Sequence, residues 1–211
     1  MPNVLIEGAH TAEHLHAEAN GTRSREVINI ASGQNLSRGA VLGKSSIGAA
    51  TAAAKAGGNT GNGTISAVTR LNGAKVGVYT ARFTAATAFN VEDPNGDVIG
   101  SGSTGAAFSD DVSFTITAGG TPFVAGDGFD ITVAAGADTW KAFDPAAVDG
   151  SQVPAGILFA AVDASAGAKK GVAHVRDVEV IGSLLVWPVG ISGPNKTAAL
   201  AALAGLGIIA R

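Results

Sequence analysis

The sequence predicts a mostly β, α+β protein, in which short strands dominate and one helix lies near the C-terminus. Apolar and polar residues alternate through the middle of the chain, and turn residues interrupt the alternation about every ten residues, as in small all-β domains. One apolar pattern of helical spacing follows, at Leu200 and Leu203. The composition agrees, because glycine fills 30 of 211 positions and only 15% of residues are charged, which disfavours a long charged helix.

The first part, residues 1–56, begins polar and ends in small residues. Residues 26–31 (EVINIA) predict a strand, which a turn-rich SGQN and the apolar residues 40–42 follow. The alanines between residues 48 and 56 are compatible with a short helix. The glycines and asparagines of residues 57–63 predict a flexible joint.

The second part, residues 57–136, is predicted to be an all-β sandwich or barrel. Residues 93–96 (DPNG) suit a type I turn between two strands of a hairpin. Because side chains alternate between the faces of a strand, the expected inward-facing sets can be read directly. They are Tyr79, Ala81, Phe83, Phe89, Val91, Val112, Phe114, Ile116, Phe129, Ile131 and Val133.

The third part, residues 137–211, mixes strands with the helix. Strands are expected at residues 157–162, 172–181 and 184–186. Asn195 or Thr197 can cap the helix, and the glycines at 205 and 207 stop it. Residues 208–211 can return as an edge strand.

Charge and cysteine content narrow the possible partners and chemistry. The formal net charge is −3 and the basic residues are scattered, so nucleic acid is not an expected partner. The chain has no cysteine, which excludes disulfides, thiol catalysis and cysteine-ligated metals. The N-terminus does not resemble a signal peptide, and the longest apolar stretches fall short of the ~20 residues of a membrane span. We therefore expect a soluble protein with no membrane partner.

The histidines near the N-terminus are a candidate metal site. His10, His14 and His16 lie near Glu7 and Glu13, and His10 and His14 would share one face of a helix. A metal-dependent hydrolase using this cluster is the rival enzymatic interpretation. The zinc motif HExxH is absent, however, and the alternative is a polar arm that becomes ordered only against a partner.

Two further candidates have simpler explanations. His174 lies in an apolar strand, where a packed and hydrogen-bonded histidine is commoner than a catalytic base. Asp127 and Asp130 belong to one copy of a glycine–aspartate pattern that binds calcium when it repeats, but aspartate is also an ordinary turn residue. The residues therefore give no convincing active site, and they favour a component of an assembly.

A series of motifs in the flanking parts is more specific than any of these candidates. The motifs are Glu7-Gly8 with His10 and Glu13, residues 18–26 (EANGTRSRE), residues 39–44 (GAVLGK), residues 143–145 (FDP), Asp149-Gly150, residues 156–158 (GIL), Asp163, residues 176–180 (RDVEV), residues 184–187 (LLVW), and an ending of Leu203, residues 206–209 (LGII) and Arg211. In this order they closely resemble the lambda-type head-decoration (capsid-stabilising) proteins of tailed bacteriophages.

The resemblance implies a non-enzymatic protein without a cofactor that binds the exterior of the expanded phage head. Members of this kind usually form a homotrimer at local three-fold sites and clamp neighbouring subunits of the major capsid protein. The implied location is the outer surface of the virion, after synthesis in the host cytoplasm. Simple members lack a long segment between Lys44 and Asp144. Residues 57–136 thus resemble a β module of other phage structural proteins, inserted into a decoration domain of residues 1–56 and 137–211 and projecting outward.

The resemblance also directs attention to specific contact residues. Strand-like segments can add to a sheet of the capsid, and Arg23, Arg25 and Glu26 can fix orientation by charge pairing, unless this run is only a solvated turn. The expected capsid contacts are Val4, Leu5, Ile6, His10, Glu13, His14, Arg23, Arg25, Glu26, Val27, Ile28 and Ile30, and the expected trimer contacts are Arg176, Glu179 and Trp187. Alternatives are a carbohydrate-binding or tail structural protein, in which Tyr79 and Trp140 would support binding of a host-surface glycan.

Overall fold

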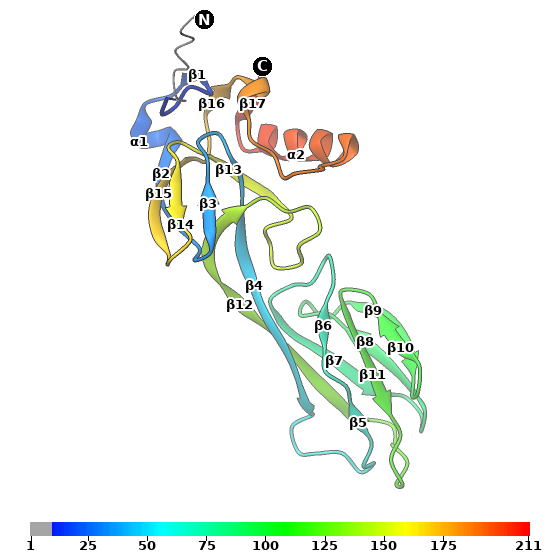
Figure 1. The fold of residues 1–211 in the computed structure, drawn as a ribbon. Helices are drawn as coiled ribbons and strands as arrows, with labels where there is room; N and C mark the ends of the chain where they lie inside the picture. The colour runs from blue at the N-terminus through cyan, green and yellow to red at the C-terminus, as the bar shows by residue number, and fades with distance from the viewer. Residues whose placement is uncertain (1–9) are drawn as a thin grey trace, which may run out of the picture. The chain divides into compact units, whose positions relative to one another are not determined.

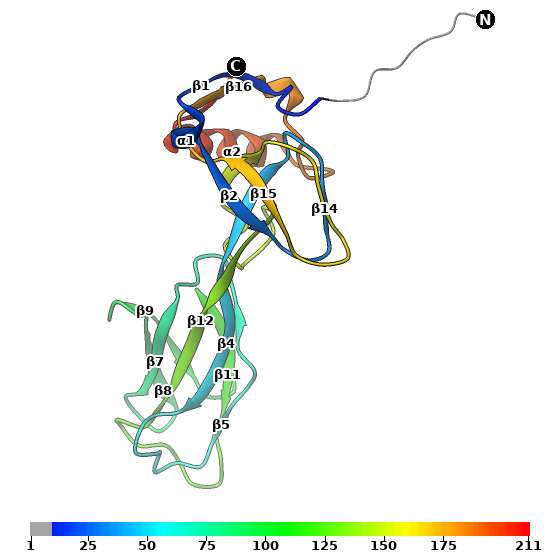
Figure 2. The same ribbon diagram turned by 90° about the vertical axis from the view of Figure 1, so that its left-hand side faces the viewer.

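A computed structural model describes residues 10–211, which form two compact units. The first, here called the barrel unit, contains the residues up to 45 together with 138–211; the second, the two-sheet unit, contains residues 46–137. Two long strands, β4 (Val41–Ala54) and β12 (Gly128–Ala142), contribute to both (Figures 1 and 2). Within residues 10–211, no helix is long and apolar enough to cross a membrane.

The barrel unit is built on five strands that close on themselves. β2 (Arg25–Ile30), β15 (Lys169–His174), β13 (Pro154–Leu158), β4 and β12 are successive neighbours in one sheet, and β12 pairs with β2 again through Trp140 and Ile30. Closure leaves the interior to apolar side chains, as in other small barrels. Ile30, Leu42 and Leu158 are fully buried there, and the ring of Trp140 packs with them.

A three-stranded sheet and the helix form a second core in the same unit. β1 (Leu15–Glu18), β16 (Val178–Val180) and β17 (Ile208–Ala210) pair in that order, and α2 (Gly193–Gly205) buries Ala199 and Leu203 in the same cluster as Val178, Val180 and Ile208. The N-cap is Ser192, whose hydroxyl accepts from the amide of Asn195, and not Asn195 or Thr197 as expected. Proline at the first turn suits this start, because its missing amide hydrogen is not needed there.

Three short elements complete the barrel unit. β3 (Gln34–Leu36) pairs with β14 (Val162–Ala164), and η1 (Gly182–Leu184) is a single 3₁₀ turn. α1 (Gly21–Ser24) begins at Asn20, whose side-chain oxygen accepts hydrogen bonds from the amide and hydroxyl of Thr22 at 3.1 and 2.8 Å. This one-turn helix turns the chain from β1 into β2.

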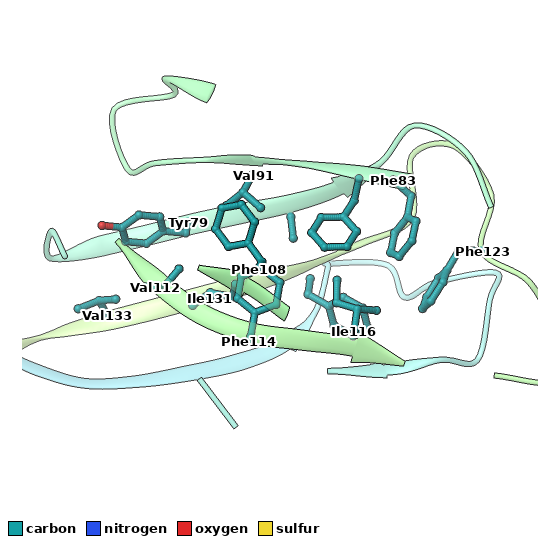
Figure 3. Packing of buried hydrophobic residues seen from close by; sticks show 13 residues of the cluster. Tyr79, Phe83, Val91, Phe108, Val112, Phe114, Ile116, Phe123, Ile131 and Val133 are labelled. Carbon is teal, nitrogen blue, oxygen red and sulfur yellow. The ribbon is translucent and has the colours of Figure 1, made fainter. Parts of the chain in front are cut away.

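The two-sheet unit has an aromatic core between its sheets. One sheet contains β12, β7 (Gly77–Phe83), β8 (Ala88–Glu92) and β9 (Val98–Ser103); the other contains β10 (Ala107–Ser109), β11 (Val112–Thr117), β5 (Thr64–Ile65) and β6 (Thr69–Arg70). Phe114 and Phe108 of the second sheet lie in this core (Figure 3). Phe89 of the first sheet stacks on Phe114, with ring centroids 6.0 Å apart. Every inward-facing residue predicted from the alternation is buried, which confirms those sets.

Several element predictions are confirmed. Besides the N-cap and the strand at residues 157–162, in which β13 ends at Leu158 and β14 begins at Val162, four are wrong. The mostly β class, the strand at residues 26–31, the turn at residues 93–96 and the C-terminal edge strand are confirmed. The expected alanine helix is wrong, because β4 continues to Ala54 and packs Ala50 and Ala52 against the aromatic core. A short alanine helix is only marginally stable alone, so pairing and packing decide this segment.

The other three errors also have local causes. The strand expected over residues 172–181 is two strands, because Asp177 adopts a left-handed conformation with φ of 50° between them. Residues 184–186 form the end of η1 and a single bridge from Val186 to Ala40. Residues 57–63 are not a flexible joint, since the carboxylate of Asp127 accepts hydrogen bonds from the amides of Thr60 and Gly61, both at 2.9 Å.

Candidate functional site

The first described residues form a turn that is tied to the barrel unit. The amide of His10 donates to the Glu13 carboxylate at 3.2 Å, and the guanidinium of Arg38 pairs with the same carboxylate. The hydrogen bond from Arg38 lowers the pKa of Glu13. Because a turn precedes β1 here, His10 and His14 do not share a helical face, and that expectation is wrong. The expected contacts Val4, Leu5 and Ile6 lie outside the described residues.

The charged run at residues 23–26 is paired within the chain. Nε of Arg23 donates to Asp177 at 2.7 Å, and Nη1 of Arg176 donates to the backbone carbonyl of Arg23 at 2.7 Å. The guanidinium of Arg176 also pairs with Glu26. These contacts join α1 and β2 to the turn before β16, so Arg23, Glu26 and Arg176 form one exposed network.

Glu18, at the end of β1, binds both Arg25 and the neighbouring Ser24. Its carboxylate accepts hydrogen bonds from Nε of Arg25 at 2.9 Å and from the buried hydroxyl of Ser24 at 2.8 Å. The hydrogen bond from Arg25 holds the pKa of Glu18 below its usual value. The guanidinium of Arg25 also lies over the ring of Phe159, 4.0 Å from its centroid. Arg25 therefore links β1 to the barrel and is not a free surface charge.

Two histidines from distant parts of the chain meet beside Glu18. Nε2 of His14 lies 3.4 Å from Nδ1 of His174, and Nε2 of His174 lies 3.2 Å from Glu18. Both rings are buried, with 1% and 0% of their surface exposed. Burial lowers the pKa of His14 to about 4, and burial also lowers the pKa of His174 although the Glu18 carboxylate opposes it. Both histidines are therefore neutral at pH 7.

The predicted contact residues of β2 divide by face. Val27 is 70% exposed and projects from the outer face of the barrel, whereas Ile28 and Ile30 are buried in its core. A buried side chain is not available to a partner unless the unit opens. The side chains that remain accessible are those of His10, Glu13, Arg23, Glu26 and Val27.

The expected trimer contacts are placed around β16 and the segment after η1. Glu179 pairs with Arg211 at 2.6 Å, and this hydrogen bond lowers the pKa of Glu179. The ring of Trp187 packs edge-on against Phe143, with centroids 6.4 Å apart, and the Lys196 ammonium lies 5.4 Å above it. The same segment exposes Leu184, Val186 and Val189, and a hollow of about 220 Å³ lies beside Trp187.

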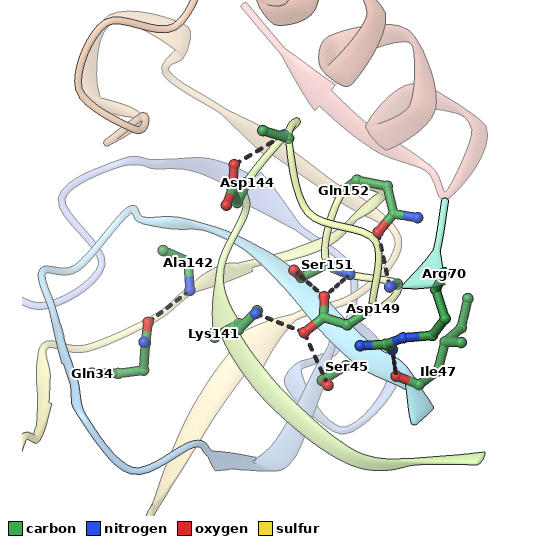
Figure 4. Close-up of polar contacts among 12 residues, drawn as sticks. Gln34, Ser45, Ile47, Arg70, Lys141, Ala142, Asp144, Asp149, Ser151 and Gln152 are labelled. Carbon is green, nitrogen blue, oxygen red and sulfur yellow. Dashed lines mark hydrogen bonds and ion pairs between the residues drawn. The ribbon is translucent and has the colours of Figure 1, made fainter. Parts of the chain in front are cut away.

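The turn after β12 is held by one half-buried carboxylate, that of Asp149 (Figure 4). Asp149 accepts hydrogen bonds from Nζ of Lys141 at 2.7 Å and from the hydroxyl and amide of Ser151 at 2.6 and 3.1 Å. Burial alone would raise the pKa of Asp149, but these hydrogen bonds outweigh it and hold the pKa well below its usual range. A Cβ on Gly43 would lie 2.3 Å from the carbonyl oxygen of Ser151. The turn can therefore pack this closely on β4 only because residue 43 has no side chain.

The motifs found along the sequence agree with a comparison against known protein families. Residues 4–208 match the family described as bacteriophage lambda head decoration protein D. The chain belongs to the lambda head decoration protein D family. The match spans both units and confirms the resemblance drawn from the sequence motifs. This head decoration family is structural and non-enzymatic, and membership supports a capsid decoration role and a place on the phage head.

The other comparisons are much more limited. No curated protein matches the sequence. Two crystal structures of Xanthomonas campestris FlgL, in space groups H3 and C2, match with 25% and 24% identity and TM-scores of 0.35 and 0.34. The matches cover 46% and 49% of this decoration protein and 32% and 33% of the FlgL chains, so this chain spans about a third of their length.

The two-sheet unit of this decoration protein does not present the residues expected for a glycan site. Tyr79 is fully buried, and its hydroxyl donates to Asp111 at 3.1 Å and accepts from the amide of Lys75 at 2.7 Å. Trp140 is 8% exposed and lies inside the barrel. Neither aromatic face is open to stack on a sugar, so these two residues cannot form the expected glycan site.

The candidate cation residues also have structural roles. Among residues 10–211, no three histidine or acidic side chains are grouped in a way that could hold a metal ion. Asp127 accepts backbone hydrogen bonds that close the end of the two-sheet unit, and Asp130 pairs with Arg82 on a strand face. These aspartates are therefore turn and sheet residues.

Sequence reasoning missed the contact between His14 and His174. The two residues are separated by 160 positions, and each alone resembles an ordinary polar or packed histidine. Glu18 and Phe159, which complete the cluster, likewise show no local signal. Only the alternation of β15, which places His174 on the same strand face as Val172 at two-residue spacing, could have indicated that its ring points to one side.

Proposed function

We propose that this protein binds the exterior of the expanded phage head as a homotrimer at local three-fold sites and clamps neighbouring major capsid subunits. The family match over residues 4–208 is the observation that carries the proposal. Repeated over many sites, individually weak contacts sum to a substantial stabilisation of a shell. Residues 57–136 are proposed to be an inserted module that projects outward, consistent with the compact unit at residues 46–137.

The proposed capsid-contact surface consists of the accessible residues near the N-terminus, namely His10, Glu13, Arg23, Glu26 and Val27. Val27 is the strongest member, because a valine 70% exposed on a strand is apolar surface that a partner would cover. Arg23 and Glu26 already have intramolecular partners, so they contribute by orienting this surface. His14, Ile28 and Ile30 are left out because their side chains are buried.

The proposed trimer contact is the apolar segment around Trp187. Leu184, Val186 and Val189 are exposed there in one short segment, and Val189 has no cover at all. An exposed apolar cluster of this kind is typical of an interface between subunits. Arg176 and Glu179 lie on or next to β16 and would form its polar border.

Co-sedimentation with expanded heads that lack the decoration protein tests the capsid contact. Wild-type protein should pellet with the heads at saturation, and Val27→Asp should bind at least about tenfold more weakly, because an uncompensated buried charge costs more than ~1.4 kcal/mol. Val98→Asp is the matched control, since Val98 is 59% exposed in the two-sheet unit. Equal binding of both variants would reject this surface, and failure of wild type to pellet would reject the function.

Light scattering of the purified protein tests the trimer. The expected mass is three times the chain mass of 20.7 kDa, either in solution or in the complex recovered from heads. Val189→Asp should shift the protein to the monomer mass while its circular dichroism stays that of wild type. A wild-type protein that is monomeric in both states would overturn the trimer proposal.

A further inference from the structure

The segment at residues 11–19 is held on the barrel unit by backbone contacts around one buried side-chain pair. The amide of Ile181 donates to the carbonyl of His14 at 2.8 Å, the amide of Ala12 donates to Phe159 at 3.1 Å, and the amide of Ala19 donates to Asp177 at 3.0 Å. Among residues 10–211, β1 pairs with one strand, β16. The His14 ring is the fully buried side chain of this segment, and Leu15 and the Glu18–Arg25 pair also hold it.

One arrangement of protons suits the neighbours of both histidines. With its proton on Nε2, His174 faces the carboxylate of Glu18 and leaves Nδ1 free to accept from Nε2 of His14. Nδ1 of His14 is then an unprotonated nitrogen, buried and without a hydrogen-bond partner. A proton added to it would have no acceptor. A proton added to Nδ1 of His174 is accepted by Nε2 of His14 only when the proton of His14 moves to its own Nδ1, which again leaves a buried N–H without an acceptor. A third proton on the packed pair therefore always leaves Nδ1 of His14 as an unpaired donor.

The charges around the pair act in opposite directions, because Arg25 and Arg38 oppose a further proton and the Glu18 carboxylate favours one on His174. Arg38, which follows β3, faces His14, and Arg25 of β2 faces His174. Glu18 of β1 is the carboxylate next to His174, and Arg25 and Ser24 already bind it. The ring of Phe159, after β13, closes another side, edge-on to His174 with centroids 5.4 Å apart. A third proton would therefore be placed between two arginines in a site closed to water.

We propose that the His14–His174 pair is an acid-sensitive latch, which holds residues 11–19 on the barrel unit when neutral and releases them when protonated. Release lets both rings take up protons in water, which is what makes the open state favourable in acid. The proposal concerns the isolated protein and does not depend on capsid binding. It gives the N-terminal segment two states that differ in which of its surfaces are exposed.

The size of the effect follows from the His14 ring alone. Its pKa falls from 6.5 to about 4 on burial, so the released state binds more protons between these values. Stability of the closed state is complete above pH 6.5 and is lost as the pH falls toward 4. From pH 7 to pH 5 the equilibrium should shift toward release by roughly twentyfold, and protonation of His174 acts in the same direction.

Amide hydrogen exchange of the full-length protein at pH 7 and pH 5 tests the latch. After correction for the intrinsic rates, protection of the Ala12, Ala19 and Ile181 amides should fall about twentyfold, whereas Val91 in the two-sheet unit should keep its protection. His14→Gln should lose most of this pH dependence, and the matched control His16→Gln, at an exposed position in β1 two residues further on, should retain it. Unchanged protection in wild type, or equal pH dependence in both variants, would overturn the proposal.

A measurement on the wild-type protein covers the case in which His14→Gln does not fold. The ring nitrogens of His14 and His174 can be followed by nuclear magnetic resonance over the same pH range. Ring protonation and loss of amide protection should share one midpoint. Rings that stay neutral while protection is lost would show that another group drives the release, and the latch would be rejected.

Discussion

Replacing Glu18 by glutamine removes the negative charge of the Glu18–Arg25 ion pair, which links β1 to the barrel, and keeps the size of the side chain. Glu18 is 15% exposed and its partner Arg25 is 30% exposed, so solvent screens their interaction only in part. Hydrogen bonds to a charged group contribute ~1.5–3 kcal/mol, and glutamine keeps one acceptor for Arg25 or Ser24. We therefore expect Glu18→Gln to lower the free energy of unfolding of the barrel unit by about 2 kcal/mol.

Tryptophan fluorescence isolates this unit, because both tryptophans, Trp140 and Trp187, belong to it. With a urea dependence of about 2 kcal/mol per M, the loss shifts the midpoint of unfolding down by about 1 M. Glu179→Gln is the matched control. Its ion pair with Arg211 is 36% and 63% exposed, and pairs this open are worth less than about 1 kcal/mol. Equal shifts for the two variants would refute the role assigned to Glu18.

The pH dependence gives a second test of the same variant. The pKa of Glu18 is lower in the folded protein than its ordinary value of 4.5, so its contribution is present above that value and is lost as the pH falls through the folded pKa. The difference between wild type and Glu18→Gln should therefore close in acid, once the wild-type carboxyl is also neutral. A difference that stayed constant from pH 7 to pH 3 would indicate a packing defect instead of a lost charge.

Three further substitutions test the cores and a cap. Phe114→Ala should destabilise the two-sheet unit by ~3–5 kcal/mol, since the ring is 3% exposed within the aromatic cluster; calorimetry that shows less than 1 kcal/mol would contradict its place there. Gly43→Ala should lower the melting temperature, because the new Cβ would meet the Ser151 carbonyl, whereas Gly120→Ala, with open space around it, should melt as wild type does. Ser192→Ala should cost ~1 kcal/mol in urea unfolding through loss of the helix cap, and an unchanged midpoint would show that Pro194 and packing suffice.

The parts of the fold that could be predicted are those in which apolar residues recur at a regular spacing in the sequence. In β7, β11 and the first part of β12, up to Val133, every second residue is apolar, and the structure buries the predicted set in each. The alternation is visible because one face of each strand packs against the facing sheet while the other meets solvent. The C-terminal helix is visible for the same reason, through Leu200 and Leu203.

β4 shows where periodicity fails. Its second half reads SIGAATAAA, in which alanine occupies both faces, so neither a helical nor a strand period is present. Alanine favours a helix intrinsically, and the strand wins only because β12 lies alongside it and the aromatic core lies beneath it. Whether this segment forms a strand or a helix thus depends on residues about eighty positions away, which a local stretch of sequence does not contain.

The intramolecular partners of the charged run at residues 23–26 could not be predicted for a related reason. Arg23, Arg25 and Glu26 all form ion pairs within the chain. Two of their partners, Asp177 and Arg176, lie about 150 residues away, beside the left-handed residue that also ended the predicted strand. No local pattern near residues 23–26 indicates these partners.

The same distance dependence explains why the histidine latch could not be predicted, and why it matters for the N-terminal segment. A decoration protein needs a segment that is ordered enough to bind in one way and free enough to reach a partner. Hydrogen bonds of β1 to β16 alone would fix the segment at every pH. Because a third proton on the buried pair has no hydrogen-bond acceptor, the free energy of attaching residues 11–19 to the barrel unit depends on pH as well as on the contacts. The segment nearest the proposed capsid surface is therefore also the one whose attachment should respond most steeply to acid.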